Sequence, residues 1–173
     1  MAIKIKELEQ VLGSSARQNK YRVSFAFPAS VSAVTALDAI DILAKSTEAP
    51  QKEIGIIELW NQGRKLPIPG DTTYDNTWTV SFYLPEDHQL RKDMLEWQNK
   101  CDNFEENIHI KSPVDVFSDL KVAQLNSQGE VSAEYILHGC WPSVVGPVTF
   151  DDSAENSPSE FEITFTYTDW MMV

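Results

Sequence analysis

The sequence has few of the residues that form disulfides, metal sites or membrane spans. Only two cysteines occur among its 173 residues, Cys101 and Cys140, and they are far apart and form no CxxC pattern. This spacing indicates neither a disulfide framework nor a zinc site. No run approaches the roughly 18 apolar residues that a membrane helix needs, and the N-terminus lacks the apolar segment of a signal peptide. We therefore expect a soluble protein of a reducing compartment, without a membrane anchor.

Positive charge is also scarce. Lys and Arg number 14 against 26 Asp and Glu, so the formal net charge is -12. Affinity for nucleic acid comes mainly from Lys and Arg that displace counterions from phosphates, so this composition argues against a sequence-reading protein. Apolar residues make up 42% of the chain and charged residues 23%, as in ordinary globular domains. We expect a single domain over residues 1–173, with residues 1–15 as an N-terminal arm.

The common catalytic motifs are absent as well. The sequence contains no GxGxxG, no Walker loop, no GxSxG and no HExxH. His138 and Cys140 are close in sequence and could be two metal ligands. A structural zinc site takes four ligands, however, and the other two histidines are in unrelated segments. The acidic stretch around Asp151 lacks the spacing of an EF-hand loop. We expect no enzyme, no cofactor and no metal site.

The sequence does contain period-two alternation of apolar and polar residues, which is typical of half-buried strands. The alternation is clearest in 21–27, in 77–84 and in a final strand over 160–170, where aromatic and aliphatic residues alternate with Thr, Ser and Glu. Pairs of apolar runs also flank NQG (61–63) and NSQG (126–129). These pairs predict β-hairpins, in the first of which a glycine supplies the positive φ that the turn requires.

One segment, LPEDHQLRKDMLEWQNK (84–100), has the pattern of an amphipathic helix that starts near Pro85. Its apolar stripe consists of Leu90, Met94, Trp97 and Cys101. Residues 29–45 suit either a helix or strands. Because strands dominate, the sequence predicts a mainly β fold, a small barrel or sandwich of antiparallel strands with one flanking α-helix.

The order of these pieces resembles the tail tube proteins of contractile-tailed bacteriophages, which are related in fold to the tubes of other contractile injection machines. The resemblance covers most of the chain after residue 15, and the stretch 28–43 fits it least well. The collinear blocks that carry it are ARQNKYRVSF (16–25), AKSTEAP (44–50), PGDTTYDNTWTVSF (69–82), HQLRKDMLEWQN (88–99), HGCWPSVVG (138–146) and FEITFTYTDW (161–170).

This resemblance implies a structural virion protein with the phage tail tube fold. Hexameric rings would stack into a hollow tube that conducts the genome during tail contraction, and strands from every subunit would form the lumen as one large barrel. The implied partners are further copies of the chain, tail sheath subunits, baseplate and tail terminator proteins, and the tape measure protein, followed by DNA in the lumen without specific binding. The implied location is the virion tail, assembled in the host cytoplasm.

The resemblance and the residue patterns together assign residues to three surfaces. A barrel pooled from many strands leaves an aqueous channel, so lumen-facing positions should be polar, and a negative wall repels DNA. By hairpin alternation, the expected lumen-facing residues are Glu58, Arg64, Glu130, Ser132 and Glu134. Segment 45–53 resembles the family loop that settles onto the adjacent ring, with Glu48, Ala49, Pro50, Gln51 and Lys52 as its contact residues. The helix residues Arg91, Lys92 and Glu96 suit either a sheath contact or a plain solvated face.

Two other functions stay open. An effector-delivery ring of a bacterial contractile injection system, of the type VI kind, would share the fold and carry proteins in place of DNA. A monomeric enzyme or sugar-binding sandwich would use the tryptophans as a platform, although core or subunit contacts are the competing interpretation for aromatic residues. The tryptophans are Trp60, Trp78, Trp97, Trp141 and Trp170.

Overall fold

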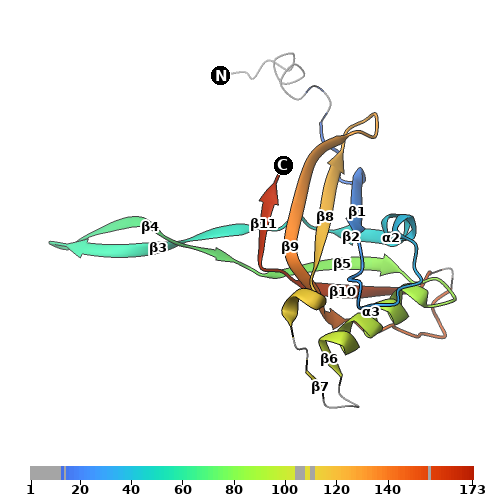
Figure 1. Cartoon of the computed structure of the whole chain (residues 1–173). Helices are drawn as coiled ribbons and strands as arrows, with labels where there is room; N and C mark the ends of the chain where they lie inside the picture. Colours follow the sequence, from blue (N-terminus) through green and yellow to red (C-terminus); the bar gives the residue numbers. More distant parts are fainter. Residues whose placement is uncertain (1–12, 14, 104–107, 110–111, 156) are drawn as a thin grey trace.

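The computed structural model describes residues 13, 15–103, 108–109, 112–155 and 157–173. Antiparallel strands dominate this part of the chain, which confirms the predicted mainly β fold (Figure 1). The strands are β1 (Tyr21–Phe25), β2 (Ala44–Thr47), β3 (Lys52–Asn61), β4 (Arg64–Tyr74), β5 (Thr77–Tyr83), β6 (Asp102–Asn103), β7 (Ile108–His109), β8 (Ser118–Leu125), β9 (Val131–Val145), β10 (Glu160–Thr166) and β11 (Asp169–Met172). The helices are α2 (Leu37–Leu43) and α3 (Gln89–Cys101), with a 3-10 turn at Pro113–Asp115.

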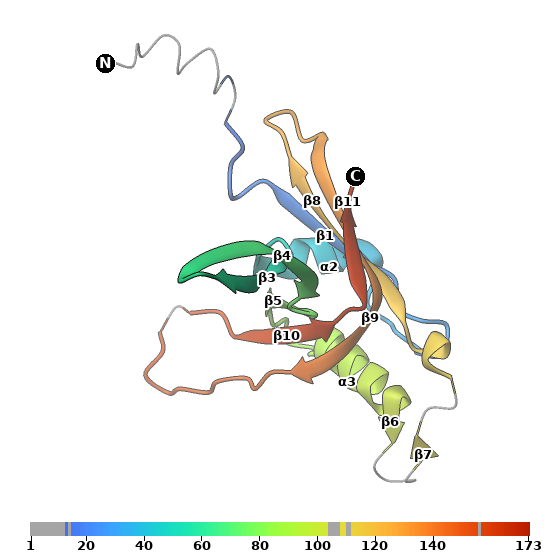
Figure 2. The ribbon, with the colours of Figure 1, turned by 90° about the vertical axis from the view of Figure 1, so that its left-hand side faces the viewer.

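Strand β9 is long enough to belong to two sheets. Its first part pairs with β8 and β11, and its last residues pair with β10. We name β1, β8, β9 and β11 sheet A, and β9, β10, β5 and β2 sheet B; Figure 2 shows sheet A rising from sheet B. Gly139 lies where the partners change, with a φ of +63°, and a Cβ there would come within 2.7 Å of the Thr168 hydroxyl. Only glycine fits this position without strain, so Gly139 allows the strand to pass from one sheet to the other.

The core lies between the inner faces of the two sheets. The alternation predicted for β1, β5 and β10 is confirmed, because the apolar set of each strand is buried. Phe25 of sheet A reaches Phe165 of sheet B, with ring centroids 5.7 Å apart. Burial of one such side chain stabilises the fold by about 1.5–3 kcal/mol. The fully buried set includes Val23, Val80, Phe82, Leu120, Leu137, Ile163 and Phe165.

Helix α3 begins at Gln89, later than the start that the sequence predicted near Pro85. His88 adopts a left-handed backbone with a φ of +54°, and the Asp87 carboxylate accepts the Gln89 N–H at 3.0 Å. A left-handed residue cannot continue a right-handed helix, so the preceding residues form a separate turn. The predicted apolar stripe is confirmed, since Leu90, Met94 and Trp97 are fully buried and Cys101 is half-buried.

Each helix lies along a strand edge. Gln98 of α3 donates to the carbonyl oxygens of Pro142 (3.3 Å) and Ser143 (3.1 Å) in β9. In β1, the Val23 N–H donates to the carboxylate of Asp41 in α2 at 3.1 Å. Unpaired edge groups recruit other chains, so these contacts close part of two edges. The segment 29–45, which its sequence left open between helix and strand, is helical only over residues 37–43; residues 44–45 begin β2, and residues 29–36 form neither.

The final strand predicted over 160–170 is two strands. Between β10 and β11, the Tyr167 N–H donates to the Asn76 carbonyl at 3.0 Å, and the Thr168 N–H donates to the His138 carbonyl at 2.9 Å. These bonds turn the chain from sheet B to sheet A. Alternation does not predict this corner. Tyr167 is buried at the corner, and it would also be buried if one strand continued through it.

Candidate functional site

Strands β3 and β4 form a hairpin that projects away from the body of the molecule (Figure 1). The predicted turn is confirmed: Gln62 and Gly63 have φ values of +49° and +77°, as a type I′ turn requires. Among the described strands, β3 and β4 pair only with each other. A two-stranded ribbon is at best marginally stable alone in water, so this hairpin needs a further surface to pack against.

The pairing register divides the hairpin into two faces, because directly opposite residues of an antiparallel pair point to the same side. One face, which we name the apolar face, consists of Ile57, Leu59, Leu66 and Ile68. The first three are 48–59% exposed. The opposite, mixed face carries an ion pair between Glu58 and Lys65, and also Trp60, which is 68% exposed. A continuous exposed apolar surface of this kind marks an interaction site.

The root of the hairpin contains the predicted inter-ring loop, which is shorter than expected: only residues 48–51 lie between β2 and β3. The Trp78 indole N–H donates to the Glu48 carbonyl at 2.8 Å, and the Trp170 indole N–H donates to the Gln51 carbonyl at 3.2 Å. Tryptophans of the body therefore hold both ends of the loop. The side chains of Glu48, Ala49, Gln51 and Lys52 are exposed, and Pro50 is half-buried.

The outward side of sheet B, which we name the polar face, carries hydroxyl and carboxylate groups. On β5 and β10 it consists of Thr77, Thr79, Ser81, Tyr83, Glu160, Glu162, Thr164 and Thr166, and β9 adds Val144, which is opposite Thr164 and 54% exposed. The hydroxyls of Thr79 and Thr164 are 3.1 Å apart, and the Ser81 hydroxyl donates to Glu162 at 3.3 Å. The Lys45 ammonium forms an ion pair with the Glu160 carboxylate at 2.5 Å, so the two charges balance and Glu162 supplies the remaining negative charge of the face. The polar face therefore presents oxygen atoms and negative charge.

The five residues predicted to face the lumen belong to two separate hairpins. The register places Glu58 on the mixed face of the β3–β4 hairpin, whereas Arg64, opposite Asn61, points to the side of the apolar face. The other three are in the β8–β9 hairpin of sheet A: Glu130, Ser132 and Glu134. Glu130 accepts a bond from the Asn126 amide at 2.9 Å, and the Glu134 carboxylate is 3.7 Å from the Lys121 ammonium.

The helix residues proposed for a sheath contact all engage neighbouring backbone. The Arg91 guanidinium points to the Gly146 carbonyl, with Nη2 at 3.4 Å. The exposed Lys92 ammonium donates to the Asp87 carbonyl at 2.7 Å, and Glu96 accepts the Ser32 N–H at 3.1 Å. Of the three, Lys92 alone has an exposed side chain.

Asp93 is a buried carboxylate that the sequence patterns did not identify, and it is 2% exposed. Its carboxylate accepts the N–H groups of Val34 (3.1 Å) and Thr35 (2.8 Å), the Thr35 hydroxyl (2.5 Å) and the Gln89 amide (2.7 Å). A buried carboxylate is tolerated when it is hydrogen-bonded in this way. The bonds hold the loop before α2 against α3. The sequence does contain a signal for this burial, because Asp93 is three positions after Leu90 and therefore lies on the apolar side of the helix.

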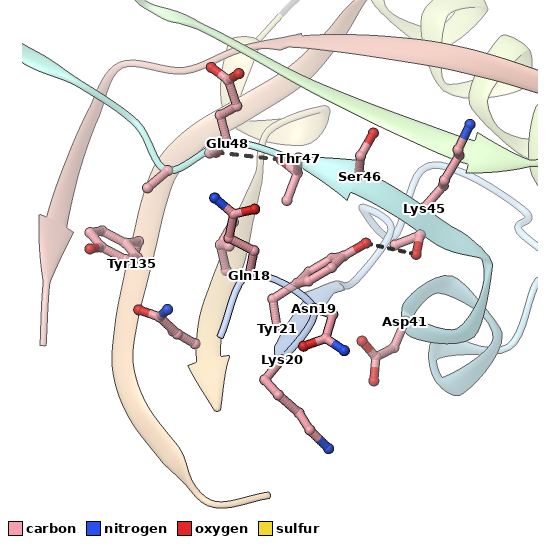
Figure 3. Close-up of a pocket in the computed structure, with 14 residues that line it drawn as sticks. Gln18, Asn19, Lys20, Tyr21, Asp41, Lys45, Ser46, Thr47, Glu48 and Tyr135 are labelled. Carbon is pink, nitrogen blue, oxygen red and sulfur yellow. Dashed lines mark hydrogen bonds between the residues drawn. The ribbon is translucent and has the colours of Figure 1, made fainter. Parts of the chain in front are cut away.

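A cavity of about 880 Å³ lies at the seam between β1 and β2 (Figure 3). The Tyr21 hydroxyl bridges this seam by donating to the Ala44 carbonyl at 3.0 Å. Burial raises the pKa of Tyr21, and Tyr83 and Asp41 add to the shift, so the phenol remains a neutral donor. The charged lining residues are Lys20, Asp41, Lys45 and Glu48. Their opposite charges balance, and the cavity is a gap between two sheet edges.

Other candidates for chemistry are few. His138 lies 3.2 Å from Asp119, and burial raises the pKa of the Cys140 thiol to about 12, which makes it a poor nucleophile at neutral pH. No cluster of three or more His, Cys, Asp or Glu that could hold a metal occurs in the described part of the chain. Nor does any helix there have the length and apolar content needed to span a membrane.

Comparison with known sequences gives one consistent result. The family model described as "Phage tail tube protein" matches residues 3–173. The tail tube protein of Serratia phage KSP90 is 27% identical over 155 residues, which cover 90% of this chain and 87% of that protein. Tail tube protein gp19 of Enterobacteria phage T4 is 28% identical over 127 residues, or 73% of this chain and 77% of that protein.

Similar solved structures come from contractile injection systems. A chain of the extended sheath–tube complex of the extracellular contractile injection system PVC matches with a TM-score of 0.65 and 15% identity, covering 99% of both chains. A chain of the anti-feeding prophage baseplate matches with a TM-score of 0.66 and 13% identity, covering 92% of this chain and 96% of that one. At these identities the similarity concerns the fold.

Proposed function

The chain belongs to the phage tail tube protein family, and from this premise we propose that its copies form hexameric rings, which stack into the hollow inner tube of a contractile tail. The tube conducts the phage genome into the host while the tail contracts. The observation that carries the proposal is the projecting hairpin, whose apolar face is exposed over Ile57, Leu59 and Leu66. A second copy of the chain covers this face.

The distribution of strand edges supports self-association at the hairpin. Helices α2 and α3 satisfy edge groups of β1 and β9 through Asp41 and Gln98. The hairpin continues the β2–β5 pair of sheet B, and it has no further strand partner among the described residues. Because unpaired edges promote strand addition, copies meet along this extension of sheet B, and ring closure removes its free edges.

We assign the channel wall to the polar face of sheet B. The outward side of sheet A carries two cations, Arg22 and Lys121, each in an ion pair, whereas the polar face carries one, Lys45. Each side has an exposed apolar residue, Met171 (50%) on sheet A and Val144 (54%) on the polar face, so the number of cations distinguishes them. Oxygen-rich, negatively charged walls do not bind DNA phosphates, because such binding depends on Lys and Arg. Two of the lumen residues predicted from sequence, Glu58 and Arg64, lie on the hairpin that extends sheet B, and Glu58 suits an acidic wall better because its side chain is a carboxylate.

The remaining roles follow from a tube that lies inside a sheath. The sheath contacts the side of the body that carries α3, where Lys92 is exposed. Baseplate and terminator proteins close the two ends, and the tape measure protein precedes DNA in the lumen. The protein acts without catalysis, and it belongs to the virion tail after assembly in the host cytoplasm. The inter-ring contact includes the loop 48–51 at the hairpin root.

An effector-delivery ring is the second candidate, because the solved structures that match are parts of contractile injection systems. That likeness is at the level of fold. The sequence relatives at 27–28% identity are phage tail tube proteins, which favours the genome-conducting tube.

Electron microscopy of the purified chain over a concentration series tests the proposal. We expect hollow rings or tubes for the wild-type chain. Leu66→Glu on the apolar face should remain a folded monomer, because a buried unpaired carboxylate opposes the contact. Lys65→Gln on the mixed face is the matched control and should assemble. A wild-type chain that stays monomeric at every concentration, even when tube ends attached to baseplates are supplied as seeds, contradicts the proposal.

A further inference from the structure

The corner between β10 and β11 contacts both segments that connect the hairpin to the body. The Tyr167 N–H donates to the Asn76 carbonyl at 3.0 Å, at the junction of β4 and β5. The Trp170 indole N–H donates to the Gln51 carbonyl at 3.2 Å, at the junction of β2 and β3. We name residues 167–170 the clasp. A single short segment of the chain therefore holds both sides of the hairpin root.

The clasp is itself fixed to sheet A. The Thr168 N–H donates to the His138 carbonyl at 2.9 Å, and Trp170 pairs with Leu137 of β9. The Trp170 ring also lies against Tyr135, with centroids 6.0 Å apart. The clasp is therefore anchored in sheet A. From there it holds the root of the hairpin, which extends sheet B. Figure 1 shows β11 rising beside the point where β3 leaves the body.

The two tryptophans at the root differ in how far they belong to the core. Trp78, which donates to the Glu48 carbonyl, is 3% exposed and lies in the core cluster. Trp170 is only partly buried, and its indole bond to Gln51 is exposed. The Trp170 bond can therefore be removed without opening the core. At the other junction, Asn76 has a left-handed φ of +56°, so the chain changes direction there.

The length of the hairpin makes its angle at the root important. Strand β3 has 10 residues, which at about 3.3 Å per residue makes the hairpin a lever of about 33 Å. A rotation of about 10° at the root would displace such a tip by about 6 Å, more than the spacing between neighbouring strands. Strand pairing with a second copy would lose its register after such a displacement.

We propose that the clasp, through Trp170, sets the angle at which the hairpin leaves the body, so that the hairpin is already aligned when copies meet. This inference rests on the proposed function, in which the hairpin is the assembling element. Trp170 is a positioning residue, because it acts on the hairpin through the Gln51 carbonyl. Alignment before contact lowers the conformational entropy that association must otherwise remove.

Trp170→Phe tests the inference, because it keeps an aromatic ring against Tyr135 and removes the indole N–H. Spin labels at Gln62 and Ser127 report the distance between the hairpin tip and the sheet A turn in the full-length monomer, with Cys101→Ser as background. We expect the distance distribution to widen about twofold in Trp170→Phe, since the lever magnifies rotation at the root. Trp60→Phe makes the same chemical change on the exposed hairpin surface, and it should leave the width unchanged.

Growth of tubes from seeds is the second readout. We expect Trp170→Phe to lengthen tubes about tenfold more slowly than the wild type, with an unchanged melting temperature. An unchanged distance distribution overturns the clasp, and a wider distribution with normal growth overturns its role in assembly. Failure of the wild-type chain to form tubes argues against the proposed function instead, because the width is measured on the monomer and tests the clasp separately.

Discussion

Trp97 of α3 donates its indole N–H to the carbonyl oxygen of Val116 at 2.7 Å. Its ring is fully buried, with centroids 6.4 Å from Phe25 of sheet A and 6.1 Å from Phe165 of sheet B. This one side chain joins the helix, the segment before β8 and both sheets. The docking of α3 therefore depends on Trp97 more than on the charged residues of the helix.

Trp97→Ala should lower the free energy of unfolding by about 3–5 kcal/mol, because it leaves a cavity among aromatic rings. Trp97→Phe keeps most of the packing but leaves the Val116 carbonyl unpaired, so its loss should be smaller, about 1–3 kcal/mol. Urea denaturation of the monomer measures both values. If Trp97→Ala melts like the wild type, the helix does not dock as described.

Asp93→Ala should lower the free energy of unfolding by about 1–3 kcal/mol, since it leaves partly buried donors of Thr35 and Gln89 without an acceptor. Glu96→Ala is the matched control on the same helix. Its bond to the Ser32 N–H is exposed, so the loss should be about 1 kcal/mol or less. Equal losses in the two denaturation curves would show that burial does not strengthen the Asp93 contacts.

Cys140 gives the protein a defined sensitivity to alkaline pH. Burial raises the pKa of its thiol from 9.0 to about 12 in the folded chain. Below about pH 9 the thiol is protonated in both states and contributes no pH dependence. Between about pH 9 and 12 the unfolded chain releases the proton first, so stability falls with rising pH by up to about 1.4 kcal/mol per unit. Cys140→Ala should flatten this part of the stability curve, measured by denaturation at each pH, and an unchanged slope would assign the loss to other groups.

Pro50→Asp should leave the monomer folded and prevent the stacking of rings. The loop 48–51 lies outside the core, so the melting temperature should not change. A new carboxylate in a chain of net charge -12 would be buried between rings without a partner, which is unfavourable. Electron microscopy should then show single rings in place of tubes. Ser127→Asp, in an exposed turn of sheet A, is the control, and normal tubes from Pro50→Asp would remove the loop from the inter-ring contact.

Thr164→Lys should convert the channel wall into a surface that binds DNA. Repetition of the new cation around every ring would place positive charge along the whole lumen, and binding should weaken steeply with salt. Retention of short linear DNA by assembled tubes measures the effect, with wild-type tubes as the reference. Ser132→Lys, at an exposed position of the β8–β9 hairpin in sheet A, is the matched comparison. If Ser132→Lys tubes retain DNA and Thr164→Lys tubes do not, sheet A lines the channel.

Much of the local structure could be predicted from the sequence because it depends on neighbouring residues. Alternation identified the buried sides of β1, β5 and β10, and the stripe of Leu90, Met94 and Trp97 identified the docked face of α3. Gly63 in NQG predicted the hairpin turn. The start of α3 was placed too early, since the left-handed conformation of His88 has no clear sequence signal.

The candidate site could be predicted only in part. Segment 45–53, predicted as an inter-ring loop, is a loop only over residues 48–51, because its ends belong to β2 and β3. Its contact with an adjacent ring stays a prediction. The lumen residues were predicted by hairpin alternation. Alternation shows that the two sides of a strand differ, but it does not show which side a second copy covers. Sequence patterns do not predict the exposed apolar face, because EIGIIELW has the pattern of an ordinary buried strand. Three of the four residues of the apolar face are nevertheless about half exposed.

The sequence alone determined the strand and helix faces, the hairpin turn and the resemblance to the tail tube family, which the family model confirms over residues 3–173. Periodicity, turn chemistry and ordered blocks of residues are all contained in the linear chain. Only the tertiary structure decided the passage of β9 between sheets at Gly139, the burial of Asp93, and the contact of Trp170 with Gln51. These features join residues that are distant in sequence, and local patterns contain no information on which distant backbone groups need a partner.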